Sequence, residues 1–198
     1  MTQRTVLVIN SGSSSIKYQL VDPDSGESLA SGIVERIGDV TGSITHKHGE
    51  ERTEITEPVP DHGFGLSEVL RLFEEQGPSL ADAHIVAVGH RVVQGGRYFS
   101  GPALIDDDVV ARIEQLVPLG PLHNPAHLKG IEVGRRLLSD VPHVAVFDTA
   151  FFQDLPEEAA RYALDREVAD TYSIRRYGAH GTSHQFVSGA VSELLGRD

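Results

Sequence analysis

The segment from Asn10 to Lys17 has the composition of a phosphate-binding turn. Its sequence is NSGSSSIK, so glycine and serine residues can direct backbone N–H groups and hydroxyls toward one point. Lys17 shares the polar face of a predicted strand with Ser15, which brings its ammonium group within reach of that point. The chain contains neither a G-x-x-x-x-G-K-[ST] nor a G-x-G-x-x-G sequence. A serine-rich hairpin with a surface lysine is the alternative interpretation.

Two charged residues follow apolar runs that are predicted to be strands. Arg91 comes after the run 85–88, and Asp148 follows the run 144–147 directly. Ligands of open α/β sheets bind beyond the carboxyl ends of the strands. The guanidinium of Arg91 could therefore bind a carboxylate or phosphate, and Asp148 could serve a metal, a water or a substrate proton. A structural arginine bound to loop carbonyls and a helix-capping aspartate are the alternatives.

Histidines occur in two pairs with four-residue spacing, His123 with His127 and His180 with His184. This spacing allows two imidazoles to bind one zinc ion on a helix. The first histidine of each pair is predicted to precede a helix N-cap, so neither pair is expected to share a helical face. The glutamate of H-E-x-x-H is also missing. A histidine just before a helix N-terminus is better placed to donate to an anion held there.

The composition excludes several other classes of function. The chain has 198 residues, no cysteine and a net charge of −12, so disulfides, thiolate catalysis and Cys-ligated metals are excluded. The negative charge argues against nucleic acid or an anionic membrane as partner. An anionic substrate would need a local cluster of Arg, Lys, His or a bound cation. A Ser–His–Asp hydrolase built from Asp148, His180 and a serine of 11–15 would lack the G-x-S-x-G motif.

These side chains must be positioned by a sheet and its helices. Short β-branched runs at Val6–Ile9, Ile85–Val88 and Val144–Phe147 predict strands covered on both faces, hence an α/β class. Ile16–Leu20 alternates and should form a hairpin with the first run. Further strand-like segments at 28–37, 43–47 and 52–56 predict an antiparallel meander. No apolar run is long enough for a signal peptide or membrane span, so we expect a cytoplasmic protein.

Helices are predicted where apolar residues recur with helical spacing. The first covers 66–73, the second follows Asp106, and the third opens at Asn124 as N-cap with proline at the next position. The last starts near Thr182, which has capping-box spacing to Gln185. This helix is the last predicted element, and no strand follows it, which suggests a protein divided in the middle.

Five motifs, in order along the whole chain, closely resemble the acetate kinase family. They are VLVINSGSSSIKY at 6–18, HRVVQGG at 90–96, PLHNP at 121–125, VFDTAF at 146–151 and YGAHGTSH at 177–184. The resemblance implies membership of the actin and sugar-kinase superfamily. It also implies an actin-like (ribonuclease H-like) ATPase domain, with a mixed five-stranded sheet flanked by helices. That N-terminal domain would cover residues 1–150, and 151–198 would begin a second, truncated nucleotide-binding domain.

The resemblance also implies a reaction and its participants. The family transfers the γ-phosphoryl group of ATP to acetate, giving acetyl phosphate and ADP, reversibly and with Mg²⁺ or Mn²⁺. The full-length enzyme is expected to be a homodimer. Carried onto this sequence, the site comprises Asn10 for magnesium, Ser13, Ser15 and Lys17 for ATP, Arg91, Val93, Leu122 and His123 for the substrate, and Arg91, Asp148 and His180 for catalysis.

Two departures from the family pattern modify these expectations. Family members commonly carry Phe where this chain has Ala179, so the acyl pocket should be wider and could accept propionate. The chain is also roughly half of the family length, so the 198 residues alone are expected to be inactive. A propionate or butyrate kinase and an inactive N-terminal fragment are the alternatives. Asp148 need not act as a base, because acetate is already ionised at neutral pH.

Overall fold

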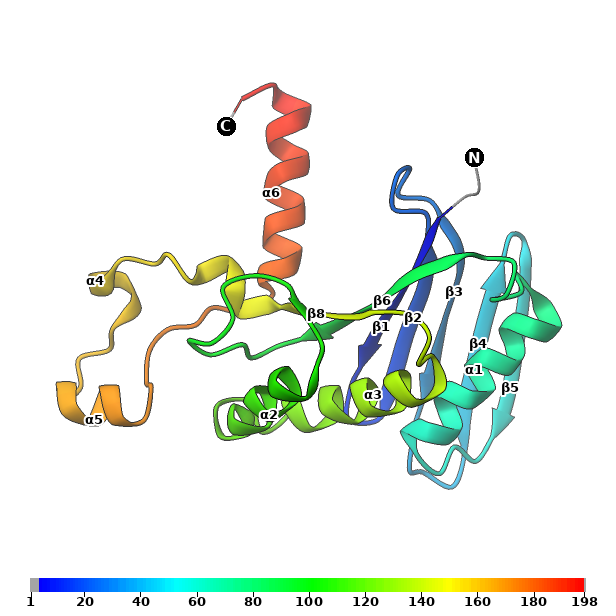
Figure 1. The fold of residues 1–198 in the computed structure, drawn as a ribbon, viewed down its shortest axis with the longest axis horizontal. Helices are drawn as coiled ribbons and strands as arrows, with labels where there is room; N and C mark the ends of the chain where they lie inside the picture. The colour runs from blue at the N-terminus through cyan, green and yellow to red at the C-terminus, as the bar shows by residue number, and fades with distance from the viewer. Residues whose placement is uncertain (1–3, 198) are drawn as a thin grey trace.

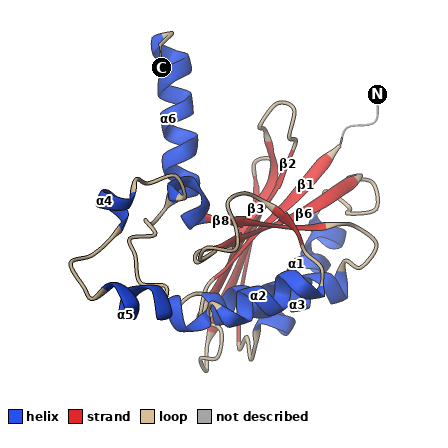
Figure 2. Ribbon diagram, turned by 60° about the vertical axis from the view of Figure 1, so that its left-hand side comes forward, coloured by secondary structure: helices blue, strands red, loops and turns tan. Residues whose placement is uncertain are grey.

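The computed structural model describes residues 4–197 as one mixed sheet with helices packed on it. The sheet has eight strands in the order β5-β4-β3-β2-β1-β6-β8-β7. Helices α1, α2 and α3 cover one of its faces (Figures 1 and 2). The predicted α/β class with a mixed, helix-flanked sheet is confirmed. The sheet is wider than the five strands expected, because the meander adds its strands directly to the edge of β2.

The antiparallel part comes first in the chain and the parallel part second. The antiparallel meander consists of β1 (Thr5–Ser11), β2 (Ser15–Val21), β3 (Ser28–Glu35), β4 (Gly42–His48) and β5 (Glu51–Glu57). On the other side of β1 lie β6 (Ile85–Val92) and β8 (His143–Phe147), which run parallel to β1, and the short antiparallel β7 (Ala103–Leu104). The predicted hairpin and meander are thus confirmed.

The strands of the parallel part are covered on one face only in the described chain. Leu7 and Ile9 of β1 are buried against the helical layer. On the opposite face Val8 is 39% exposed, and Val86 of the neighbouring β6 is 42% exposed. The prediction that these runs are covered on both faces is therefore wrong for the described residues, since α1, α2 and α3 all pack on the same side.

The four predicted helices occur in the predicted order, and short α-helices and 3₁₀ helices lie between them. They are α1 (His62–Gln76), α2 (Asp107–Gln115), the 3₁₀ turn η1 (Val117–Leu119), α3 (Asn124–Leu137), the 3₁₀ helix η2 (Asp148–Phe152), α4 (Glu157–Ala160), α5 (Arg166–Thr171) and α6 (Gly181–Leu195). Asp61 caps α1 and Asp106 caps α2 through side-chain oxygens that accept from backbone N–H groups. None of the helices between residues 4 and 197 is long and apolar enough to cross a membrane.

Two predicted N-caps have other roles. Asn124 is the first residue of α3, and its side chain accepts from the backbone N–H of Gln94 and donates to the Gln94 carbonyl. Thr182 lies inside α6 and donates to a carboxylate oxygen of Asp148, so the predicted capping box does not form. In both cases a partner distant in the sequence competes successfully with the local backbone.

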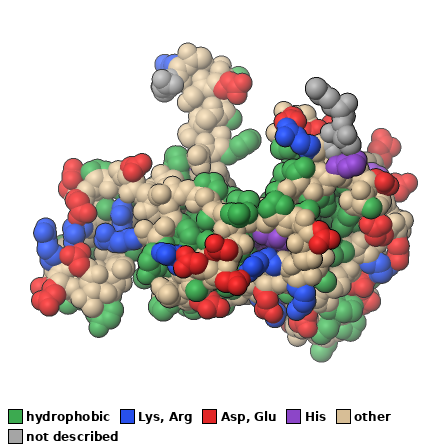
Figure 3. Space-filling model, in the orientation of Figure 1, with side chains coloured by type: hydrophobic (Ala, Val, Ile, Leu, Met, Phe, Trp, Pro, Cys, Tyr) green, Lys and Arg blue, Asp and Glu red, His purple; other side chains and the backbone are tan. Residues whose placement is uncertain are grey.

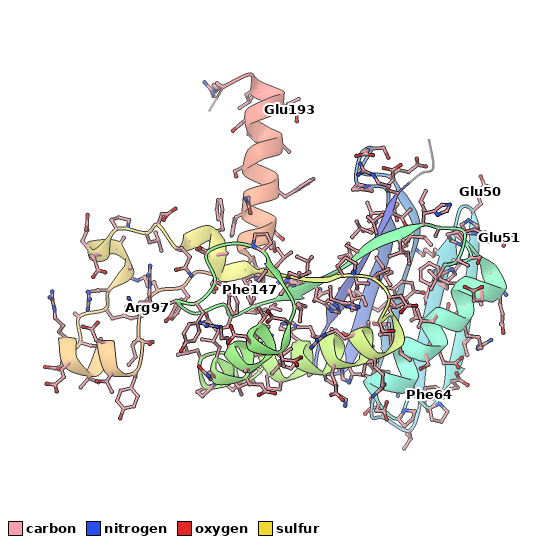
Figure 4. The ribbon with its side chains drawn as sticks, viewed as in Figure 1. Glu50, Glu51, Phe64, Arg97, Phe147 and Glu193 are labelled. Carbon is pink, nitrogen blue, oxygen red and sulfur yellow. The ribbon has the colours of Figure 1, made fainter. Side chains whose placement is uncertain are left out.

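Two apolar clusters hold the layers together. The first joins β1 to β4 with α1, and the second joins β6 and β8 with α2 and Phe99. Phe147 ends β8 close to the base of α6 (Figure 4). Its ring stacks on that of Phe99, with centroids 4.1 Å apart. By contrast, α6 projects from the body, and its apolar side chains are exposed, with Phe186 at 76% and Leu194 at 84% (Figures 1 and 3).

Candidate active site

Strand register places three predicted site residues on the same face of the sheet. Asn10 of β1 pairs with Lys17 of β2, and Arg91 is one residue beyond the pairing of Ile9 with His90. Because successive side chains alternate between faces, Asn10, Lys17 and Arg91 all lie opposite the helical layer. They also lie near the carboxyl ends of the parallel strands β1 and β6, where ligand sites of open α/β sheets occur.

A cavity of about 350 Å³ opens at this edge of the sheet. It contains every predicted site residue except Ser13 and Leu122. Ser13 is exposed, and Leu122 is 79% exposed. The residues that line the cavity are Asn10, Gly12, Ser15, Lys17, Arg91, Val93, His123, His127, Asp148, Ala179 and His180.

Arg91 and Asp148 form an ion pair in the wall of the cavity. Arg91 Nε donates to both carboxylate oxygens at 3.2 and 3.3 Å, and Nη2 donates to Oδ2 at 2.7 Å. Thr182 Oγ1 donates to Oδ1 at 2.7 Å. The Asp148 side chain is 1% exposed and that of Arg91 is 31% exposed. The carboxylate is therefore held inside, while part of the guanidinium remains available to a ligand.

The surroundings of Asp148 keep its carboxyl group ionised. Burial alone would raise the pKa of Asp148, but the hydrogen bonds from Arg91 and Thr182 and the nearby positive charges together outweigh burial and place the pKa below its ordinary value. The nearby charges of Arg91 and His180 act in the same direction. Because four hydrogen bonds already occupy the two oxygens, this carboxylate is suited to fix Arg91 in place.

His180 lies beside the same guanidinium. Its Nδ1 is 3.5 Å from Arg91 Nη2, and the residue adopts a left-handed backbone conformation with φ of 54° directly before α6. Gly181 follows, and a Cβ at that position would lie 1.8 Å from the Asp148 carbonyl oxygen. Only glycine permits this approach, which brings the start of α6 and His180 against the end of β8.

The serine-rich turn closes as predicted between β1 and β2. The N–H of Gly12 donates to the carbonyl of Ser15 at 2.7 Å. From outside the turn, His62 Nε2 hydrogen-bonds to the Gly12 carbonyl at 2.7 Å. Ser15 and Lys17 both border the cavity, whereas Gln19 lies further along the polar face of β2.

The histidines of α3 differ from the prediction in one respect. His123 is the N-cap residue, and its ring stacks on that of His127, with centroids 6.3 Å apart and 13° between the planes. The two rings therefore do face each other. Burial lowers the pKa of His127 to about 4, so this imidazole is neutral at neutral pH. Among residues 4–197, no group of three or more His, Cys, Asp or Glu side chains could hold a metal ion.

The sequence does not indicate three of the residues near the cavity as site residues. The spacing of Thr182 to Gln185 is typical of a helix cap, although Thr182 is two residues from His180 in the same motif. The spacing of His127 to His123 points only to zinc binding. His62 contacts the turn from fifty residues away, and no local pattern signals such a contact.

The residues present fit a magnesium ion that is held mainly by phosphate and water. Magnesium in nucleotide sites takes one or two protein oxygens and keeps several waters. Asn10 presents a side-chain amide to the cavity, and among the described residues no hydrogen-bond partner is assigned to it. The Asp148 oxygens are already bonded to Arg91 and Thr182. Asn10 thus has a side-chain oxygen that a metal ion in the cavity could use.

Local charge at the cavity contrasts with that of the whole chain. The chain carries a net charge of −12, and acidic side chains are spread over the face seen in Figure 3. The cavity holds Lys17, Arg91 and three imidazoles against the single carboxylate of Asp148. This concentration of donors meets the requirement for an anionic ligand.

Fold and cavity together define an α/β domain with a cationic site at the carboxyl ends of its parallel strands. The family model of the Acetokinase family matches residues 5–198. The chain belongs to this family.

Several relatives resemble the chain over nearly all of its length. It is 54% identical to the acetate kinase of Corynebacterium aurimucosum, over 98% of this chain and 48% of that protein. Crystal structures of Porphyromonas gingivalis acetate kinase and of a propionate kinase from Francisella tularensis both superpose with a TM-score of 0.91. Their identities are 41% and 39%, over 98% of this chain and 50% of each structure. The chain thus spans about half the length of these relatives.

Proposed function

We propose that this chain forms the carboxylate-binding and phosphate-binding part of a carboxylate kinase. The reaction is reversible transfer of the γ-phosphoryl group of ATP to acetate, giving acetyl phosphate and ADP. The observation that carries the proposal is the buried Asp148, which holds Arg91 in a cavity shared with Lys17 and His180. Family membership and the acetate kinase relatives support the same reaction.

Arg91 binds the anionic oxygens of the acceptor. Asp148 occupies the Nε and Nη2 side of the guanidinium, and within residues 4–197 the Nη1 hydrogens have no partner. A guanidinium fixed in this way is pre-organised, because its orientation is set before the ligand arrives. Acetate and the γ-phosphate repel each other, and the positive charge of Arg91 reduces that repulsion.

Asp148 acts as a positioning group in this proposal. Its hydrogen-bonded, ionised state makes it a poor acceptor for a further proton, and ionised acetate has no proton to give. Thr182 assists by holding Oδ1. His180, which lies next to Arg91, would donate to the equatorial oxygens of the transferring group, where charge must be stabilised.

Lys17, Ser13, Ser15 and the turn around Gly12 receive the phosphates of ATP. Lys17 and Ser15 border the cavity from the β2 side, which suits a chain of phosphates running toward Arg91. Asn10 would contribute an oxygen to the bound magnesium. When bound, magnesium would neutralise charge on the phosphates.

Val93 and Ala179 form the apolar part of the acyl site, and His123 borders it. The small side chain of Ala179 leaves room for an additional methylene, so propionate is the alternative acceptor. The similarity to a propionate kinase structure is compatible with this alternative. Leu122 contributes little to this pocket, because its side chain faces solvent.

The wider assignment rests on the family resemblance. We propose that residues 1–150 form the N-terminal actin-like domain and that 151–198 begin the nucleotide-binding domain. The enzyme would act in the cytoplasm as a homodimer. Turnover is expected in a polypeptide of the family length, and the 198-residue chain alone should be inactive.

A hydroxamate assay with ATP, Mg²⁺ and acetate tests the reaction in the full-length polypeptide. The Arg91→Lys variant keeps a positive charge beside Asp148 but loses the planar fork. It should lower kcat/KM about 100-fold or more. Arg112→Lys is the matched control, since Arg112 pairs with Asp108 on the exposed surface of α2. If Arg91→Lys and Arg112→Lys have equal kcat/KM values, the proposed role of Arg91 is contradicted.

A further inference from the structure

His62 is outside the cavity but is bonded to its serine-rich turn. Its Nε2 lies 2.7 Å from the carbonyl oxygen of Gly12, fifty residues earlier in the chain. A backbone carbonyl can only accept, so Nε2 carries the hydrogen and His62 is the donor. The bond therefore fixes the direction of the Gly12 carbonyl.

The opposite end of the same peptide group is fixed by this bond. In a planar trans peptide, the carbonyl of one residue and the N–H of the next point in opposite directions. With the Gly12 carbonyl directed at His62, the N–H of Ser13 is directed away from His62. Within residues 4–197, no hydrogen-bond partner is assigned to this N–H. Gly12 lines the cavity, whereas His62 does not.

His62 belongs to a helix that is firmly anchored in the core. His62 is the first residue of α1, and this helix is capped separately by Asp61, whose side chain accepts from the N–H of Phe64 at 2.9 Å. Leu66 and Phe73 anchor the helix in the core with exposures of 1% and 0%. The hydrogen bond from the His62 imidazole therefore holds the turn at a fixed position relative to α1.

We propose that His62 is a positioning residue that aims the Ser13 N–H at a phosphate of the bound nucleotide. The inference rests on the proposed function, because it takes the turn to be the phosphate site. A glycine peptide can flip easily, and a flipped Gly12–Ser13 peptide would present a carbonyl oxygen to an anion. His62 keeps the peptide in the orientation that attracts phosphate.

Substitutions of His62 separate the hydrogen bond from other effects. His62→Gln can place an amide N–H close to the position of Nε2, whereas His62→Asn carries the same group on a shorter side chain and His62→Ala carries none. The matched control is His48→Ala, because His48 Nδ1 bonds to the Gln76 carbonyl at the other end of α1 at 3.0 Å. His48 is remote from the turn, so the His48→Ala variant shows the effect of removing a hydrogen bond to α1 without disturbing the turn.

The test measures the Kd for MgATP by calorimetry, and the KM values for ATP and acetate, in the full-length polypeptide. His62→Ala and His62→Asn should weaken MgATP binding and raise the KM for ATP by about fivefold, the effect of one net hydrogen bond. The KM for acetate should stay unchanged. His62→Gln should restore most of the affinity, and His48→Ala should match the parent.

Several results would overturn the inference. These are parental MgATP affinity in His62→Ala, failure of His62→Gln to restore it, or equal changes for ATP and acetate. If the parent binds MgATP but forms no acyl phosphate, the proposed reaction is contradicted. The MgATP affinities of the His62 variants would then still test this inference. A parent that binds neither MgATP nor inorganic triphosphate would refute both.

Discussion

Two stacked, buried histidines should make the fold sensitive to acid. His90 of β6 and His143 of β8 have ring centroids 5.2 Å apart, and His90 Nε2 lies 2.9 Å from His143 Nδ1. His143 Nε2 donates to the Leu138 carbonyl at 3.0 Å. Because that carbonyl can only accept, neutral His143 carries its hydrogen on Nε2 and accepts at Nδ1. His90 must therefore donate from Nε2.

Protonation would disrupt the present pattern of hydrogen bonds. A second hydrogen on His143 would occupy Nδ1 and face the N–H of His90, so the bond would persist only if His90 moved its hydrogen from Nε2 to Nδ1. Burial, followed by the charges of His143 and His127, lowers the pKa of His90 to about 3. Burial also lowers the pKa of His143. Both rings are therefore neutral in the folded protein at neutral pH.

The sign and size of the effect follow from linkage. An unfolded histidine titrates near pH 6.5, whereas folded His90 titrates near pH 3. Between these values the unfolded state binds more protons, so stability falls as the pH falls. From pH 8 to pH 5, His90 alone should lower the free energy of unfolding by about 2 kcal/mol. His127, with a pKa of about 4, should contribute a similar loss of about 2 kcal/mol.

Urea unfolding at pH 8, 6.5 and 5 measures this effect in the parent and in His90→Gln. The glutamine can still donate to His143 but does not titrate. His90 and His127 together account for a loss of about 4 kcal/mol in the parent, to which His143 and His46 add, and the variant should lose about 2 kcal/mol less than the parent. Equal losses in the two proteins, or a parent equally stable at pH 5 and pH 8, would refute the reasoning.

Three further substitutions test the site. Thr182→Val removes one hydrogen bond to Asp148 and should lower kcat/KM about fivefold while the thermal midpoint changes little; an unchanged rate would contradict the positioning role. Ala179→Phe should narrow the acyl pocket and shift the acetate-to-propionate ratio of kcat/KM about tenfold toward acetate, and an unchanged ratio would place the acyl group elsewhere. Gly181→Ala introduces a Cβ 1.8 Å from the Asp148 carbonyl, so it should displace α6 and abolish activity; parental activity would contradict the observed packing.

Local patterns in the sequence predict much of the fold because local forces decide it. The helix α1 follows from its apolar spacing, and α2 follows from the same spacing and its aspartate cap. The hairpin around the serine turn follows from alternation in β2. The apolar runs before Arg91 and Asp148 predict that each residue lies at the carboxyl end of a strand, whereas the pairing of the two side chains follows from the adjacency of β6 and β8 in the structure.

Other features depend on contacts that no local pattern encodes. Thr182 and Asn124 have the chemistry of helix caps, yet a buried carboxylate and a loop backbone bind them instead. The apolar runs of β1 and β6 do not reveal that helices cover only one of their faces. The bond from His62 to Gly12 joins segments fifty residues apart, and only the packing of α1 on the sheet creates it.

The central claim is that Arg91, Lys17 and His180 serve transfer of a phosphoryl group between a carboxylate and a nucleotide. Phosphorus NMR of the full-length polypeptide with acetyl phosphate and MgADP tests it most directly. We expect the γ-phosphate signal of ATP to grow as that of acetyl phosphate declines, and growth to be strongly slowed in Arg91→Lys. Conversion of acetyl phosphate to inorganic phosphate alone, with no ATP formed, would contradict the proposal.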